Sequence, residues 1–240
     1  ADRIYQINIA IAGIAIGTVI LPNLSRYIKT SNSKKIEFIQ NKSFELCLFL
    51  SLPASMALIV ASEEITSALF GYGAFDATSV LNSSKALYYF ALGLPAFAII
   101  KVFSTFLFAR DNTKTPFYYS LISVFVNIVI SVSFFKEVGF IIIPIATSIS
   151  SWLNALLLFI KLYFNNYFNL SSILNSKNLK IFLVSGISIY IFDIFINLFK
   201  DFLIYGSDLK LFTMIALVVI TILIYILISL ITKTFKYSDI

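Results

Sequence analysis

The residues that could do chemistry in this sequence are a few charged side chains set within long apolar stretches. Asp2 and Arg3 stand at the head of the first stretch, and Lys101 lies well inside the third. A charge at the depth of a membrane is costly unless it is paired or hydrated, so each position is a candidate functional residue. Arginine's planar fork suits the oxygens of a phosphate or diphosphate, so Arg3 could grip an anionic lipid head group. The structural alternatives are that Asp2 and Arg3 flank a helix at the outer interface, and that Lys101 snorkels toward the helix end near Arg110.

Other polar side chains within the apolar stretches also need a partner. Asp193 stands in the sixth stretch with Asn197 one turn on, and Asn127 and Asn154 lie in the fourth and fifth. Asp193 could be a hydrated residue near a helix end or a group that couples transport to protons or ions. The two other amides are typical of hydrogen bonds between membrane helices.

The chemistry that the sequence lacks narrows the function. It has no histidine, one cysteine (Cys47), no Walker-type lysine motif, no Gly-x-Ser-x-Gly and no close carboxylate pair in the apolar stretches. The usual acid–base groups and metal ligands are therefore missing, and one cysteine can form neither an intrachain disulfide nor a metal cluster. We expect no enzymatic activity, no metal and no cofactor, which leaves transport, scaffolding or sensing.

The elements that must position these residues are membrane helices. Hydrophobic residues make up 59% of the chain and charged residues 12%, against roughly 45–50% and about 25% in soluble domains. So little charge could not cover a soluble fold, and the stretches lack the alternation of barrel strands. We therefore predict an all-α integral membrane protein with about seven transmembrane helices. They are expected at 4–24, 44–61, 87–108, 117–135, 140–164, 181–199 and 211–231.

Prolines within these stretches add a requirement. Such a proline is tolerated in a membrane helix where a neighbour supplies a donor to the carbonyl that it frees. The residues concerned are Pro22, Pro53, Pro95 and Pro144.

The basic residues gather on one side of the predicted helices. The first, third and fifth connections and the C-terminal tail hold twelve of the eighteen, and the second, fourth and sixth hold four. The positive-inside rule places the richer side, and the C-terminus, in the cytoplasm. This asymmetry explains the net charge of +6 without nucleic acid as a partner. Two connections on that side, 25–43 and 165–180, are long and amphipathic, which predicts helices lying at the interface.

Three motifs in order along the chain resemble the MurJ (MviN) family of lipid II flippases. The first stretch opens with Ala-Asp-Arg at 1–3 and closes with Gly-x-Ala-x-Gly-Thr-x-x-Leu-Pro-x-Leu-Ser at 13–25. An external segment at 69–75 reads Leu-Phe-Gly-Tyr-Gly-Ala-Phe. Residues 101–116 combine Lys-Val with Phe-Ala-Arg-Asp-Asn-Thr-Lys-Thr-Pro. One such motif would be weak, whereas three at plausible spacing are specific.

The resemblance implies the fold and its divisions. Family members have two lobes of the multidrug/oligosaccharidyl-lipid/polysaccharide exporter type, followed by two extra helices. Residues 1–164 would be five transmembrane helices of the second lobe, which lacks its first helix here. Residues 165–240 would be the two additional C-terminal transmembrane helices with a preceding amphipathic segment. We expect the chain to be a C-terminal half that works with an N-terminal half of the same protein.

The function implied by the resemblance is the flipping of lipid II, an undecaprenyl-diphosphate-linked disaccharide-pentapeptide. It would move from the inner to the outer leaflet of the bacterial cytoplasmic (inner) membrane. Arg3 would contact the diphosphate, with Asp2 as its orienting partner and Lys101 as a weaker candidate. The polyprenyl tail would stay among membrane lipids, along an apolar groove formed by 181–199 and 211–231. The alternatives are a polysaccharide-lipid or drug exporter of the same superfamily and a non-transporting membrane scaffold.

Overall fold

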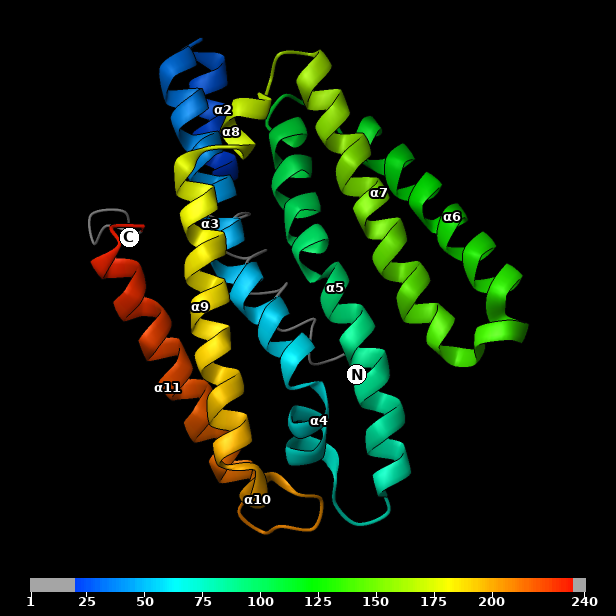
Figure 1. Ribbon diagram of the computed structural model, residues 1–240. Helices are drawn as coiled ribbons and strands as arrows, with labels where there is room; N and C mark the ends of the chain where they lie inside the picture. Colours follow the sequence, from blue (N-terminus) through cyan, green and yellow to red (C-terminus); the bar gives the residue numbers. More distant parts are fainter. Residues whose placement is uncertain (1–19, 235–240) are drawn as a thin grey trace.

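The computed structural model describes residues 20–234, which form a bundle of α-helices with no strand among them (Figure 1). The long helices run alternately up and down between the two ends of the bundle. The elements are α2 (Leu21–Lys29), α3 (Ser33–Val60), α4 (Ser62–Phe70), α5 (Ala77–Phe108), α6 (Lys114–Val138), η2 (Gly139–Ile141), α7 (Ile142–Phe164), α8 (Leu170–Ile173), α9 (Ser176–Leu198), α10 (Lys200–Leu203) and α11 (Lys210–Ile231).

Helix α5 lies at the centre of the bundle, between α3 and α7. At Gly93 an added Cβ would lie 2.7 Å from the Ser148 Oγ and 3.0 Å from its Cα, so α5 and α7 approach closely only because this residue is glycine. The Ser148 hydroxyl donates to the carbonyl of Tyr89, and the Trp152 Nε1–H donates to the carbonyl of Leu92 at 3.0 Å. Small residues and interhelical hydrogen bonds are the usual means of holding helices together in lipid.

Pro95 lies inside α5 and leaves a carbonyl without its helical donor. Proline has no N–H, so the carbonyl four residues earlier, that of Ala91, loses its bond. The hydroxyl of Ser55 in α3 donates to this carbonyl at 2.6 Å, and Ser55 is buried. The proline thus creates the acceptor through which α3 and α5 are joined.

Pro53 does the same within α3. The carbonyl that it frees belongs to Phe49, and the Tyr225 hydroxyl of α11 donates to it at 2.8 Å. A residue near the end of the chain therefore satisfies an acceptor in the first long helix. For both prolines the expected donor from a neighbouring helix is confirmed.

Helices α6 and α7 form a hairpin at the edge of the bundle (Figure 1). The chain reverses at Gly139, whose φ of 73° lies in the region that favours glycine. The amide of Asn127 donates to the hydroxyl of Thr147 at 3.0 Å, which confirms an interhelical bond at this position. The side-chain oxygen of Asn154, by contrast, has no hydrogen-bond partner among the described residues.

The C-terminal helices pack on the outer side of α3. Helix α9 lies against α3, and α11 lies against α9 and reaches α4. At the start of α9, the Lys177 ammonium lies 3.7 Å from the buried Glu45 carboxylate of α3. The Asn178 amide donates to the carbonyls of Ser172 and Ile173, both in α8, at 2.9 and 3.0 Å.

The predicted spans coincide with the observed helices beyond residue 20. Among the described residues, five segments are long and apolar enough to cross a membrane, and one of them, 114–164, contains both α6 and α7. The predicted stretches from 44–61 onward thus match α3, α5, α6, α7, α9 and α11. The first stretch, 4–24, lies almost wholly outside the described residues, so the total of seven stays a prediction.

The connections differ from the expected interfacial helices. The chain turns after α2, and α3 begins at Ser33, where the side chain of Asn32 accepts from the Lys35 N–H. From there α3 continues into its apolar part without a break, and Gln40 and Ser43 are already buried in the bundle. The second connection, 165–180, holds only the short α8 before α9 begins at Ser176. Residues 33–43 and 176–180 are therefore the first turns of long helices. Ile36 and Ile39 of the first segment pack against the core, and Asn178 of the second is buried against α8.

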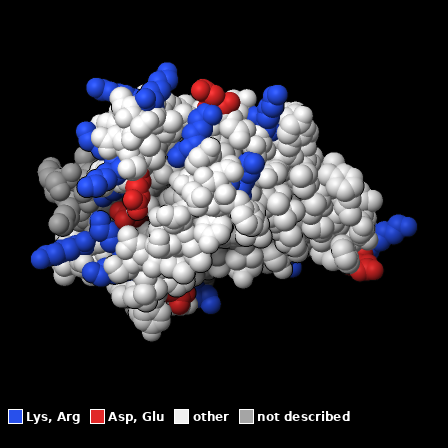
Figure 2. Space-filling model, turned by 90° about the horizontal axis from the view of Figure 1, so that it is seen from above, with Lys and Arg blue, Asp and Glu red and all other residues white. Residues whose placement is uncertain are grey.

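Basic side chains cluster at one end of the bundle, which we call the basic end (Figure 2). It is formed by α2, the start of α3, the loop after α5, α8, the start of α9 and the end of α11. Its described basic residues are Arg26, Lys29, Lys34, Lys35, Lys42, Arg110, Lys114, Lys161, Lys177, Lys180 and Lys233. The opposite end carries Lys85, Lys136, Lys200 and Lys210. The fold therefore separates the charges as the connection pattern predicted.

The bond from Ser55 to the carbonyl freed by Pro95 gives a test of the packing. Ser55→Ala should lower the free energy of unfolding by about 1–3 kcal/mol, because it leaves a buried carbonyl without a donor. In a Pro95→Ala background the helix supplies its own N–H, so the same change should cost much less. Thermal unfolding of the purified variants in detergent measures this double-mutant cycle. An equal cost of Ser55→Ala in both backgrounds would contradict the assignment.

Candidate functional site

The predicted charged residues fall in different parts of the chain. Asp2 and Arg3 lie outside the described residues, and so does the Gly13–Gly17 pair of the first motif. Lys101 lies on α5 and its side chain is exposed, whereas its neighbours Val102 and Phe103 are buried in the core. Within residues 20–234 no ion pair includes Lys101. Lys101 therefore stands at an exposed position of α5.

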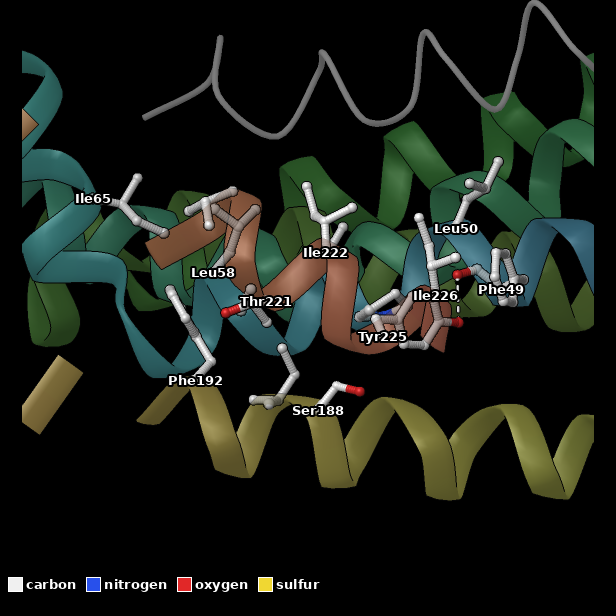
Figure 3. A pocket seen from close by; sticks show the side chains of 15 residues that line it. Phe49, Leu50, Leu58, Ile65, Ser188, Phe192, Thr221, Ile222, Tyr225 and Ile226 are labelled. Carbon is white, nitrogen blue, oxygen red and sulfur yellow. Dashed lines mark hydrogen bonds between the residues drawn. The ribbon is translucent and has the colours of Figure 1, made fainter. Parts of the chain in front are cut away.

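An apolar groove lies between α3, α9 and α11 (Figure 3). Its cavity measures about 370 Å³. Figure 3 shows Ser188 and Phe192 on α9 facing Thr221 and Tyr225 on α11. The lining residues are Phe49, Leu50, Pro53, Ala54, Ala57, Leu58, Ile65, Ser188, Ile189, Phe192, Val218, Thr221, Ile222, Tyr225 and Ile226.

No charged residue lines this groove. Two of its three hydroxyl groups are already hydrogen-bonded to backbone carbonyls of the surrounding helices. The Thr221 hydroxyl donates to the Leu217 carbonyl at 2.7 Å, and the Tyr225 hydroxyl donates to Phe49. The buried Ser188 hydroxyl has no hydrogen-bond partner among the described residues. Such a surface offers dispersion and hydrophobic contact and no recognition of charge, so a hydrocarbon chain is the ligand that it suits.

The groove has a wall that the hydropathy pattern did not indicate. We expected it to be formed by the last two apolar stretches alone, but α3 and the first turn of α4 supply its other side, including Pro53 and Ile65. The signal was present in Pro53, whose freed carbonyl needs a donor from another helix. Which helix supplies that donor is a matter of tertiary packing, because Tyr225 is far away in sequence.

Four charged residues, Glu63, Glu64, Asp193 and Lys200, interact beyond the groove, at the end of the bundle opposite the basic end. Asp193 near the end of α9 interacts electrostatically with Glu64 of α4, as does Lys200. Burial raises the pKa of the Glu64 carboxyl, Glu63 and Asp193 raise it further, and Lys200 opposes them. The half-buried Asp193 thus lies in a group of charges near the end of α9, and its role stays a prediction.

Comparison with known proteins agrees with this architecture. A family model described as "Lipid II flippase MurJ" matches residues 1–237. A probable lipid II flippase MurJ from Rhizobium tropici is 42% identical over 68% of the chain, and one from Rhizobium meliloti is 41% identical over 70%. The chain spans 31% of the length of each of these relatives.

A solved structure extends the agreement to three dimensions. The chain superimposes on a lipid II flippase MurJ in an inward closed conformation with a TM-score of 0.76 and 28% identity. The match covers 96% of this chain and 45% of that one. The family model over nearly the whole sequence and this shared fold lead to one assignment: the chain belongs to the MurJ family of lipid II flippases.

Proposed function

We propose that this chain takes part in flipping lipid II from the inner to the outer leaflet of the bacterial cytoplasmic membrane. The observation that carries the proposal is the uncharged groove between α3, α9 and α11 in a chain of the MurJ family. The substrate joins a long polyprenyl tail to a charged diphosphate with sugars and a peptide. A carrier for such a molecule needs an apolar path for the tail and a separate cationic site for the head.

The groove would hold the tail, because its walls are aliphatic and aromatic and lie beside lipid-exposed helix faces. Its hydroxyls at Thr221 and Tyr225 already have acceptors in the protein, so they do not favour a polar ligand. Tail binding of this kind gains free energy from contact area and is tolerant of tail position. That tolerance suits a tail that must slide as the head crosses the membrane.

The head group would be held by the charged residues. Arg3 would contact the diphosphate with two N–H groups, Asp2 would orient Arg3, and Lys101 would add a weaker cationic contact from its exposed position on α5. Residues 1–164 would act as a transporter lobe and residues 165–240 as the helix pair that supports the tail. An N-terminal half of the same protein would complete the cavity, and rocking of the two halves would expose it alternately to each side.

Flipping should depend on the apolar surface of the groove. Ile222 lines the groove and is 51% exposed, while the next residue, Leu223, is 55% exposed and lies outside it. Ile222→Asn should weaken tail binding about tenfold or more, because an amide without a partner in an apolar site costs about 1–3 kcal/mol. Leu223→Asn is the matched control with the same cost of inserting an amide into lipid.

The measurement is complementation of a bacterium depleted of its own flippase, using the full open reading frame that encodes this chain. The labelling of lipid II at the outer leaflet reports transport directly, and a blot reports protein level. Ile222→Asn should label poorly at normal protein level, and Leu223→Asn should label like the wild type. Failure of the wild-type protein to restore outer-leaflet lipid II would refute the proposed function.

The charged residues should differ in importance. Arg3→Ala should abolish growth under depletion, and Arg3→Lys should impair it, because lysine keeps the charge and loses the planar fork. Lys101→Ala should be milder, since Lys101 is exposed and water can replace its ammonium. Growth curves with protein levels checked by blot compare the three variants. Normal growth of Arg3→Ala at normal level would make Arg3 a helix flank and refute its assignment.

The basic end should face the cytoplasm, and with it the C-terminus. Ser33 is exposed at the basic end and Thr78 is exposed at the opposite end. In a Cys47→Ala background, a membrane-impermeant maleimide added to intact cells should label Thr78→Cys and leave Ser33→Cys unlabelled. Permeabilised cells provide the control in which both positions react. Labelling of Ser33→Cys in intact cells would invert the topology.

A further inference from the structure

Lys210, the first residue of α11, is a buried lysine with no acidic partner among the described residues. Its side chain is 1% exposed, and no ion pair within 20–234 includes it. Its ammonium donates to the carbonyl of Gly71 and lies 4.1 Å from the ring centre of Tyr72 and 5.0 Å from that of Tyr205. A carbonyl and two aromatic faces therefore stabilise a cation that is withdrawn from water.

This arrangement, which we call the Lys210 clamp (Lys210, Gly71, Tyr72 and Tyr205), joins two loops that are far apart in sequence. Beside it the Tyr205 hydroxyl donates to the carbonyl of Phe75 at 3.1 Å. Gly71 leaves no space for a side chain, because an added Cβ would lie 2.6 Å from the Ser67 carbonyl oxygen and 3.2 Å from the Lys210 ammonium nitrogen. The loop after α4 is thus shaped around the lysine.

The clamp lies just beyond the outer end of the apolar groove. Along α11, Lys210 precedes the groove residue Val218 by about two turns. On the other side, Gly71 follows α4, whose Ile65 also lines the groove. Helix α11 packs mainly against α9, α10 and α4. Because α4 directly follows α3 in the chain, the contact between α11 and α4 connects α11 to the wall that α3 forms.

We propose that Lys210 is a positioning residue that fixes the outer end of this groove and so sets its fit to a long polyprenyl tail. Without the ammonium, the Gly71 carbonyl and the two rings lose the group that holds α11 against α4. The two walls would then separate at this end, while Tyr225 still held α11 to α3 and Lys177 still held α9 to α3 further along. The inference rests on the proposed function, since it concerns the tail that the groove would bind.

The experiment compares two probes that share a diphosphate and differ in tail length, undecaprenyl diphosphate and farnesyl diphosphate. Their affinities are measured by native mass spectrometry or thermophoresis on the full-length protein in nanodiscs. Lys210→Met keeps the length of the side chain and removes the charge. Tyr205→Leu weakens the clamp from the opposite side. Lys136→Met is the matched control, because Lys136 is an exposed lysine at the same end of the bundle.

The wild type should bind the longer probe more tightly. Lys210→Met should weaken undecaprenyl diphosphate about tenfold, equivalent to ~1.4 kcal/mol, and leave farnesyl diphosphate unchanged. Tyr205→Leu should act in the same direction, and Lys136→Met should bind like the wild type. If the wild type shows no preference for the longer tail, the groove assignment fails and the clamp's role fails with it. If the preference exists and survives Lys210→Met, or if both probes weaken equally, the positioning role of Lys210 is refuted while the tail groove stands.

Discussion

In hydrocarbon a backbone carbonyl without a donor is costly, because no water is present to satisfy it. Pro53 and Pro95 each create such a carbonyl in the middle of a long helix, and in each case a hydroxyl from another helix donates to it. These two bonds join α3 to α5 and α3 to α11. The arrangement of the bundle around α3 depends on them, since the helices that carry the donors cannot move away without leaving a buried acceptor unpaired.

The same constraint shapes the groove. Because Tyr225 must reach Phe49, α11 is held across the gap from α3 by a side chain, while its helix packs mainly on α9 and α4. The space between the two helices is therefore lined by the sides of aliphatic and aromatic residues. Its polar atoms are mostly engaged with the protein. The hydrogen bond from Tyr225 to the carbonyl that Pro53 frees thus also links the two walls of an apolar groove that suits a hydrocarbon ligand.

Most charged side chains lie at the two ends of the bundle, away from its apolar middle. The basic end carries most of the described lysines and arginines, and Glu45 with Lys177 ties α3 to α9 there. At the opposite end, Lys210 is buried against a carbonyl and two tyrosine rings. Lys101 differs from both, as an exposed lysine on the central helix. A lysine in an apolar stretch and a buried lysine at a helix start therefore serve different purposes, which only their surroundings reveal.

The sequence by itself determined the class of the protein and the positions of its long helices. Hydropathy is a local property, and a stretch of about 20 apolar residues without charge has few stable forms in lipid. The family motifs and the separation of basic residues were likewise readable along the chain. The sequence also indicated that Pro53 and Pro95 would need donors, without indicating which residues would supply them.

Only the tertiary structure decided which residues meet. It paired Ser55 with Ala91 and Tyr225 with Phe49, made α3 a wall of the groove, and placed Lys210 against Gly71. It also showed that residues 33–43 begin α3, where periodicity alone had suggested a separate helix at the interface. These outcomes depend on contacts between helices far apart in sequence. An amphipathic or polar residue can satisfy its requirement against lipid, water or a neighbouring helix, and the local pattern is the same in each case.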